Sequence, residues 1–246
     1  MRALHGGSTL NTRDATWQEV EAAIAASGDK AVAIWGWGSV EQHGPRMLME
    51  TDALIAEHFA DVPTIARGAI KFPTVPIGMA RHHEAFPGTT SLSQEAAYGV
   101  AASVLRSIYR TGIRKLVALM GHGGNVAPFH AAVKGLSKEL DGLTVLEPLD
   151  ALFYTKEGEL GELLNSFGED VSHAGAAEAS ILYAMLNRLG RHEEVKRLQA
   201  VVITDEMATL GIHGQGTKGG DPAEFRRMFP FGSKGDQRKA DIHKGV

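Results

Sequence analysis

Two periodicities of apolar residues alternate along this chain, one typical of buried strands and the other of amphipathic helices. The stretch 31–38, AVAIWGWG, is apolar on both faces, as a strand at the centre of a parallel sheet requires. The stretch 93–112 instead repeats its apolar residues on one face of a helix. The same two patterns predict further strands at 72–78, 115–120, 143–149 and 200–204, and further helices at 16–28, 53–62, 127–140 and 174–189.

The order of these elements predicts the fold class. Strands that alternate with helices indicate an α/β fold, in which helices cover both faces of a mostly parallel sheet. No repeat, low-complexity tract or linker divides residues 1–246, so we expect one domain, with loops from about residue 211. In such a sheet, ligands bind beyond the carboxyl ends of the strands. The strand ends are therefore the place to look for a functional site.

Composition narrows the functional classes. Apolar residues make up 43% of the chain and charged residues 22%, as in a globular protein. The net charge of −4 decides little, but no run of five Lys or Arg residues offers nucleic acid a binding patch. No apolar stretch approaches the length of about 18 residues that a membrane helix needs, and the N-terminus lacks a signal-peptide layout. We therefore expect a cytoplasmic protein. Because the chain has no cysteine, any metal must be held by His, Asp and Glu.

Chemically active side chains gather where the predicted strands end. Glu41 and His43 follow the strand at 31–38, and their spacing of two points both side chains to the same side of an extended backbone. The glycine-rich turn GHGGN, residues 121–125, follows the strand at 115–120. The polar residues at or near these ends are Glu41, His43, Asp52, His82, His83, His122, His173 and Glu178.

Most of these residues also have an interpretation without chemistry. Asp52 could cap the helix that follows it. His82 or His83, taken singly, is typical of a surface loop. The glycines of 121–125 could serve only to turn the chain, and His173 could precede its helix without a chemical role.

Glu178 is harder to explain in this way. It lies three and four residues before Ile181 and Leu182, which begin the apolar stripe of the predicted helix, and it shares their face. An inward carboxylate is costly unless a cation or strong donors meet it. We therefore expect a metal ion or an arginine beside Glu178.

Together, three carboxylates and two imidazoles form a donor set for divalent metal ions. Glu41, His43, Asp52, His122 and Glu178 suit Zn²⁺ or Mn²⁺. Asp52 could bridge two ions about 3.5–4 Å apart, and the number of ligands favours two ions over one. The sequence lacks the motifs of competing sites, namely the P-loop, the dinucleotide-binding glycine motif, the HExxH zinc motif and the serine elbow.

These motifs resemble those of the creatininase (creatinine amidohydrolase) family of metal-dependent hydrolases. The matching segments are 38–45 with Thr51-Asp52, 82–89, 121–125 and 173–180. They occur in the family's order and spacing and extend over most of the chain. The resemblance implies a three-layer α/β/α fold with two metal ions at the carboxyl ends of the strands.

The resemblance also implies how the ligands are divided. Glu41, Asp52 and His122 would hold one ion, and His43 and Asp52 the other. In creatininase itself, a glutamate two residues after the motif histidine completes the second site, whereas this chain has Gly124 there. We assign that ligand position to Glu178, the inward-facing glutamate of the helix predicted at 174–189. The ions expected are Zn, Mn or Fe.

Catalytic roles follow from the same resemblance. His173 stands at the position of the family's catalytic histidine, which passes a proton to the leaving nitrogen. The peptide N–H groups of Gly123 and Gly124, or the side chain of Asn125, would hold the oxyanion. We place the pair His82-His83 at the pocket wall, with His83 as the second candidate for the proton shuttle.

The predicted activity is hydrolysis of a C–N bond in a small molecule, with cyclic amides or N-formyl compounds as the preferred substrates. The glycine at position 124 argues against creatinine. One alternative is a hydrolase of a cyclic ketone or lactone on the same scaffold. Another is a protein that binds a metal or small ligand without turnover.

The resemblance further implies a homo-oligomer, commonly a hexamer, in which neighbouring subunits supply part of the pocket walls. Trp35, Trp37 and the run 47–49 lie near the proposed site and could belong to its interface. The alternative is that these residues fill an ordinary core.

Overall fold

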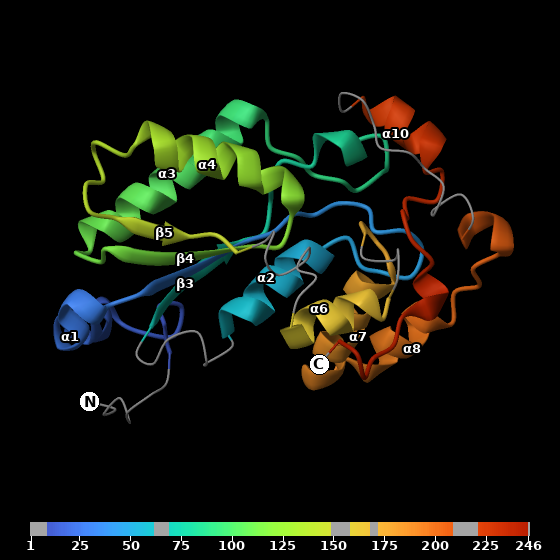
Figure 1. Cartoon of the computed structure of the whole chain (residues 1–246), viewed down its shortest axis with the longest axis horizontal. Coiled ribbons are helices and arrows are strands. Elements are labelled where there is room, and N and C mark those ends of the chain that lie inside the picture. The colour runs from blue at the N-terminus through green and yellow to red at the C-terminus, as the bar shows by residue number, and fades with distance from the viewer. Residues whose placement is uncertain (1–8, 62–68, 149–157, 168–171, 209–220, 246) are drawn as a thin grey trace.

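A parallel five-stranded sheet forms the centre of the structure (Figure 1), a computed structural model that describes residues 9–61, 69–148, 158–167, 172–208 and 221–245. The strands are β1 (Leu10–Asn11), β2 (Ala33–Trp37), β3 (Ile70–Val75), β4 (Lys115–Met120) and β5 (Thr144–Leu146). Their order across the sheet is β1-β3-β2-β4-β5, and every neighbouring pair is parallel. The strand β2 is thus central, as its apolar sequence predicts.

The helices are α1 (Trp17–Ser27), α2 (Thr51–Asp61), α3 (Gln94–Arg110), α4 (Val126–Gly135), α6 (Gly158–Asn165), α7 (Ala176–Arg188), α8 (His192–Gln199) and α10 (Pro222–Met228). Short 3₁₀ turns include η2 (Arg81–His83), η3 (Gly123–Asn125) and η5 (Gln237–Lys239). Among the described residues, no helix is both long and apolar enough to cross a membrane.

Both faces of the sheet are covered, which confirms the predicted three-layer α/β/α class. Trp35 and Trp37 pack with α3 and α4 in one core, which also contains Leu105 and Phe129. Ile34 directly precedes Trp35 in the sequence and packs on the opposite face, with residues of α2. Successive side chains of a strand point to opposite faces, so a strand that is apolar throughout serves both layers. The tryptophans fill the core of this chain and offer no interface.

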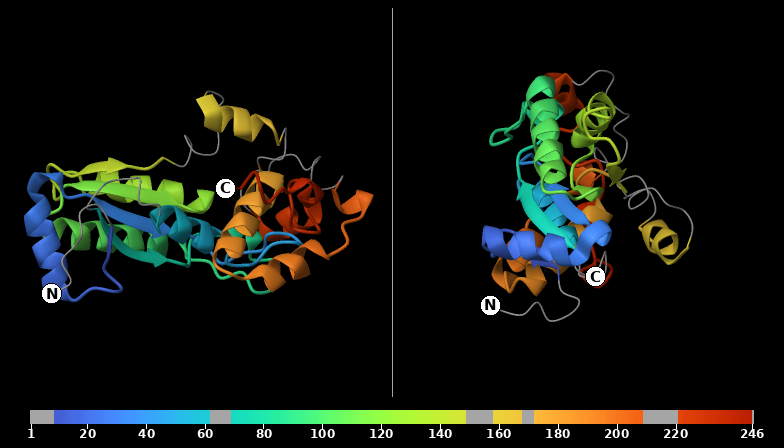
Figure 2. Two further views of the ribbon diagram at one scale, coloured as in Figure 1. Left: turned by 90° about the horizontal axis from the view of Figure 1, so that it is seen from below. Right: turned by 90° about the vertical axis from the view of Figure 1, so that its left-hand side faces the viewer.

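A further group of helices lies beyond the carboxyl ends of the strands. The helices α7 and α8 pack against each other through a core that includes Leu182, Tyr183 and Val195, and α7 also contacts α2. Figure 2 shows these helices beside the sheet at that end of the molecule. The helices α7 and α8 therefore cover the edge of the fold at which β2 ends and its following loop begins.

Hydrogen bonds from Gln237 and Tyr183 hold the loop after β2 in place. Gln237 donates from Nε2 to the His43 carbonyl at 2.8 Å and accepts from the Arg46 amide through Oε1 at 3.1 Å. Tyr183 donates its hydroxyl to the Arg46 carbonyl at 2.9 Å. The loop that carries His43 is therefore held by residues from the last part of the chain.

Some predictions from the sequence are wrong in detail. Residues 200–204, predicted as a strand, form none, and the exposed side chain of Val202 explains why, because an apolar run becomes a strand only where it can be buried. The helix predicted at 127–140 ends at Gly135 and continues as turns. The strand predicted at 143–149 ends at Leu146, and its last residue lies outside the described part of the chain.

Within the described residues, the strand β1 and the helices α6, α8 and α10 have no counterpart among the predicted elements. The strand β1 has two residues and the three helices have seven or eight, too few to show a period clearly. The helix α10 falls in the region predicted as loops. Its start carries a local signal, because Asp221 accepts a hydrogen bond from Ala223 N at 2.9 Å and Pro222 occupies the first turn.

Glycines allow α2 to approach the strand ends closely. A Cβ on Gly121 would lie 2.0 Å from the Asp52 carbonyl oxygen, whereas a Cβ on Gly123 would meet nothing within 4 Å. We expect Gly121→Ala to lower the free energy of unfolding by about 1–3 kcal/mol, because the two backbones must separate. Gly123→Ala, the matched control, should change it by less than about 0.5 kcal/mol. Denaturant unfolding measures both, and equal stabilities would contradict the close approach.

Candidate metal centre

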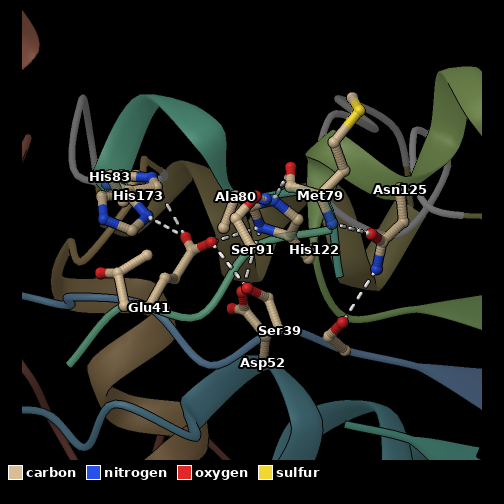
Figure 3. Close-up of polar contacts among 12 residues, drawn as sticks. Ser39, Glu41, Asp52, Met79, Ala80, His83, Ser91, His122, Asn125 and His173 are labelled. Atoms are coloured by element: carbon tan, nitrogen blue, oxygen red, sulfur yellow. Dashed lines mark hydrogen bonds and ion pairs between the residues drawn. The ribbon is translucent and has the colours of Figure 1, made fainter. Parts of the chain in front are cut away.

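The five predicted ligands come together at the carboxyl ends of the central strands. Glu41 and His43 lie on the loop after β2, and His122 directly follows β4. Asp52 lies in the first turn of α2, and Glu178 in the first turn of α7. Figure 3 shows the carboxylate of Glu41 between His122 on one side and the imidazoles of the opposite wall on the other. Glu178 is the most exposed of the five, at 15% of its side chain.

Asp52 is not the residue before the helix, as the capping interpretation requires. The helix α2 begins at Thr51, so Asp52 is its second residue. The two oxygens of its buried carboxylate point at different imidazoles. Oδ1 lies 2.9 Å from Nε2 of His43, and Oδ2 lies 3.1 Å from Nδ1 of His122. The carboxylate of Asp52 therefore lies between the imidazoles of His43 and His122.

The protonation of His122 follows from its neighbours. Its Nε2 lies 3.1 Å from the carbonyl oxygen of Met79, which can only accept a hydrogen bond. Nε2 therefore carries the hydrogen of the neutral ring, and the lone pair is on Nδ1. That atom faces two carboxylates, with Glu41 Oε2 at 3.0 Å and Asp52 Oδ2 at 3.1 Å.

The same reasoning applies to His43. Its Nδ1 lies 3.1 Å from the carbonyl oxygen of Glu41 and donates to it. The lone pair on Nε2 then faces Asp52 Oδ1 at 2.9 Å and Glu178 Oε1 at 3.6 Å. The other oxygen of Glu178 accepts a hydrogen bond of 2.7 Å from the Ala174 amide, which orients the carboxylate.

These atoms fit a divalent metal ion. A lone pair that faces a carboxylate oxygen at about 3 Å is repelled unless a proton or a metal ion lies between them. In addition, Glu41 Oε1 and Asp52 Oδ2 are buried and accept no hydrogen bond of good geometry, with imidazole nitrogens at 3.2 and 3.1 Å, and buried charged atoms of this kind are costly. Imidazole nitrogens and carboxylate oxygens are ligands that zinc and manganese accept. A hydrogen bond to the far ring nitrogen, as both imidazoles make here, is the usual support of a metal-binding histidine.

The structure brings the candidate ligands together in three overlapping sets, each with ligand atoms within 4.8 Å of one another. One set is Glu41, Asp52 and His122; a second is His43, Asp52 and Glu178; the third is Glu41, His43 and His173. The first two sets share Asp52 and correspond to the division expected from the sequence. The third includes His173, the predicted proton shuttle, among the candidate ligands.

Electrostatics within the cluster favours positive charge. Burial lowers the pKa of the His43 and His122 imidazoles, but the neighbouring carboxylates outweigh burial and raise both pKa values well above the usual range. For Glu41, burial raises the pKa, and the imidazoles of His122 and His83 override it and hold the pKa well below its usual range. The cluster therefore holds cations, whether they are protons or metal ions.

Two further side chains orient Glu41. Ser39 donates its hydroxyl to Oε2 at 2.9 Å, and Nε2 of His83 lies 3.2 Å from Oε1. The sequence predicts His83 at the pocket wall, but its ring is buried and faces the carboxylate itself. His82 packs beside it, with ring centroids 3.9 Å apart, and burial lowers the pKa of His82 to about 3.

Gln42 joins the two histidines on this side of the cluster. Its Oε1 accepts from the Gly44 amide at 3.1 Å, which fixes the orientation of the side-chain amide and places Nε2 among the imidazoles. Nε2 lies 2.7 Å from His83 Nδ1 and 2.9 Å from His173 Nε2. Sequence reasoning gave Gln42 no role, although its place between two predicted ligands was a signal.

Asn125 does not lie where the oxyanion interpretation needs it. Its side chain is completely buried, and Oδ1 accepts from the Met79 amide at 2.9 Å. Nδ2 donates to the Gly38 carbonyl at 3.0 Å and lies 3.3 Å from the Trp37 carbonyl (Figure 3). The amide thus joins the ends of three strands, and we withdraw it as an oxyanion donor.

Gly124 has no room for a side chain in this arrangement. A Cβ there would lie 2.2 Å from the Met79 carbonyl oxygen and 2.4 Å from Nε2 of His122. The hydrogen bond that orients His122 therefore occupies the space of any side chain at position 124. This geometry agrees with the assignment of the remaining ligand position to Glu178.

An aromatic wall closes the far side of the histidines, and sequence reasoning missed it. The ring of Phe225, on α10, is fully buried and lies 4.6 Å from His83, 5.5 Å from His82 and 6.4 Å from His173, measured between centroids. The sequence around α10 gave no sign of this contact beyond the helix-start signal.

The raised pKa values predict how the stability of the metal-free protein depends on pH. Unfolded imidazoles titrate near about pH 6.5. Because the folded pKa values of His43 and His122 lie above this, their stabilisation is fully present below about pH 6.5 and is lost as pH rises through the folded values. We expect the Tm of metal-free protein to fall as pH rises from about 6.5, and that of zinc-loaded protein not to fall in that range.

His43→Gln should flatten the metal-free profile, because one of the two titrating groups is gone. A metal-free Tm that stays constant or rises across this pH range would contradict the electrostatic account of the cluster. Differential scanning calorimetry measures all three profiles.

Comparison with known proteins agrees with this geometry. The family profile described as creatinine amidohydrolase matches residues 13–246. The creatinine amidohydrolase of Pseudomonas putida is 29% identical over 182 residues, which cover 69% of each chain. A mycofactocin precursor peptide peptidase of Mycobacterium tuberculosis is 30% identical over 212 residues, covering 78% of this chain and 77% of that one.

Solved structures give the same result. A mutant creatininase described as the Zn-Zn type superposes with a TM-score of 0.74 at 25% identity, and the match covers 97% of this chain and 92% of that one. The profile, the sequence relatives and the solved structure all agree with the cluster of buried carboxylates and imidazoles at the strand ends. The chain therefore belongs to the creatininase family of metal-dependent amidohydrolases.

Proposed function

We propose that this chain hydrolyses a C–N bond of a small molecule, an amide, cyclic amide or N-formyl group, with two divalent metal ions held by its five predicted ligands. The observation that carries the proposal is the position of Asp52. Its two oxygens face Nδ1 of His122 and Nε2 of His43, which belong to different ligand sets. A bridging carboxylate of this kind is typical of two-metal hydrolytic sites.

Zinc, manganese or iron are the ions we propose, and the similar creatininase described as the Zn-Zn type supports zinc. When bound, such ions lower the pKa of water towards neutrality and polarise a carbonyl group. Glu41, Asp52 and His122 would hold one ion, and His43, Asp52 and Glu178 the other. Ser39 and His83 contact the two oxygens of Glu41 and orient its carboxylate.

His173 is placed to move a proton. Its Nε2 lies 3.0 Å from the Gln42 carbonyl oxygen, and its Nδ1 lies 3.6 Å from Glu41 Oε1, on the side of the cluster. Burial and the neighbouring imidazoles of His43 and His83 hold the pKa of His173 well below its usual range. The ring is therefore neutral at physiological pH, so its unprotonated nitrogen can accept a proton and return it to a leaving nitrogen.

The names of the relatives support the type of bond. An amidohydrolase and a peptide peptidase both cleave a C–N bond. The crowded, largely buried surroundings of the cluster suit a small substrate. Gly124, where creatininase itself carries a glutamate ligand, argues against creatinine, so cyclic amides and N-formyl compounds remain the substrates we favour.

A homo-oligomer, commonly a hexamer in the family, and a cytoplasmic location stay predictions. Met47 packs in the core around α7, as Trp35 and Trp37 do in the main core, so none of these three argues for an interface. The exposed side chain of Trp17, on α1, is a better candidate for one.

Removal of Asp52 tests the bridging role. Asp52→Ala should lose both metal ions and all hydrolysis of a panel of cyclic amides and N-formyl amines, because the two ligand sets proposed to hold the ions both contain this carboxylate. Glu95→Ala, which removes an exposed acid from the first turn of α3, is the matched control and should keep both. Elemental analysis and the hydrolysis panel measure the outcome. An Asp52→Ala protein that keeps its metal content and turnover would refute the proposed function.

Replacement of His173 tests the proton shuttle. His173→Gln should keep the metal content and Tm and lose about 10²–10⁴-fold in turnover, the usual effect of a positioned acid–base group. The control His130→Gln changes an exposed histidine on α4 and should leave turnover intact. If His173→Gln instead loses metal in proportion to activity, His173 is a ligand, as the set of Glu41, His43 and His173 allows.

A further inference from the structure

Lys234 is a half-buried lysine that the proposed mechanism does not use. It follows α10 in the chain, and its amide donates to the carbonyl oxygen of His173 at 3.0 Å. This hydrogen bond fixes the backbone of Lys234 beside the residue proposed as the proton shuttle.

The ammonium group lies against the aromatic wall of the site. Nζ is 5.2 Å from the ring centroids of both Phe225 and Phe229. Phe225 also contacts His82 and His83. Burial lowers the pKa of Lys234, and the carboxylate of Glu41 opposes that shift, so the two charged groups act on each other across the site.

No carboxylate of the described residues forms an ion pair with Lys234. Other cations of this region are satisfied: Arg226 donates to the Ala85 carbonyl, and Arg238 forms ion pairs with Asp236 and Asp205. A half-buried charge without an opposite charge is unfavourable, and two aromatic rings compensate for only part of it. An anion that arrives with the substrate would supply the missing partner.

The charge of the loaded site favours the same kind of ligand, and here the inference rests on the proposed function. Two divalent ions would exceed the three carboxylates of the cluster by one positive charge, and Lys234 adds another. In such a place, an anionic substrate is attracted and a cationic one is repelled.

We propose that Lys234 binds a carboxylate of the substrate, so that the substrates of this chain are small amides or N-formyl compounds that carry an acidic group. A single ammonium matches a carboxylate better than a phosphate, which proteins bind with several donors. Lys234 is then a specificity-determining residue. It orients the substrate by its acidic end while the scissile carbonyl lies at the metal cluster.

The alternative is that Lys234 only packs on the aromatic rings. Lys244 provides the matched control, because its Nζ lies 5.0 Å above the ring of Phe167 and plays no part in the proposed site. If the ring contact is all that matters, Lys234→Met and Lys244→Met should alter Tm alone.

The test measures binding and requires no knowledge of the substrate. Zinc-loaded protein is titrated in a calorimeter with monohydroxamates of malonic, succinic and glutaric acid, whose hydroxamate groups ligate zinc. Each is compared with its primary amide, which has the same shape and no charge. We expect the best acid to bind about tenfold more tightly than its amide, as one hydrogen bond between charged groups provides. Lys234→Met should abolish this preference, Lys234→Arg should keep most of it, and Lys244→Met should leave it unchanged.

The outcomes separate the two proposals. If acid and amide bind the wild-type protein equally at all three lengths, the inference about Lys234 is wrong and the metal site stands. The inference also fails if Lys234→Met or Lys234→Gln, folded by calorimetry, keeps the preference. If no hydroxamate binds the zinc-treated protein, the proposed metal site is refuted and the role of Lys234 with it.

Discussion

The structure around the strand ends depends on one electrostatic constraint, which is that three buried carboxylates must share positive charge. Carbonyl oxygens of Met79 and Glu41 fix the rings of His122 and His43 so that their lone pairs face the carboxylates. In that arrangement, a cation between nitrogen and oxygen is required. A metal ion would supply this positive charge by binding both the imidazole nitrogen and the carboxylate oxygen. Without metal, a proton supplies it, because the pKa of each imidazole is raised. The carboxylates and imidazoles that would bind metal are therefore the groups that would repel each other most strongly without a cation.

Close backbone contacts put these groups within reach of each other. Gly38 and Gly121 lie so near the start of α2 that a Cβ on either would overlap its backbone, at 2.3 Å from Ala53 Cα and 2.0 Å from the Asp52 carbonyl oxygen. Asp52 is therefore positioned by the ends of β2 and β4. The side chain of Asn125 reinforces this arrangement by joining the loop after β3 to the end of β2. The glycines let the strand ends approach the start of α2, and this brings the histidine and acidic side chains of these segments together.

The sequence predicted the features that repeat or that follow directly from the sheet. Central strands and long helices carry a clear hydrophobic period, so their positions could be predicted. Polar residues at the strand ends of a parallel sheet lie close together, so the cluster of five candidate ligands could be predicted as well. By contrast, Phe225 on the short helix α10 and Lys234 after it come to the histidines from a distant part of the chain, and no local pattern records such contacts. The role of Asn125 was inferred from its place in the turn that carries His122, whereas its partners in space are carbonyl and amide groups of the backbone.

The hydrogen bonds between Gln237 and the loop of His43 and Arg46 span more than 190 residues of sequence, with 194 between Gln237 and His43. Proteins are synthesised from the N-terminus, and contacts between distant residues form only when both have left the ribosome. The loop that presents His43 therefore lacks this anchor until Gln237 has left the ribosome. A nascent chain would form its sheet first and complete the binding centre only after the segment around Gln237 has emerged.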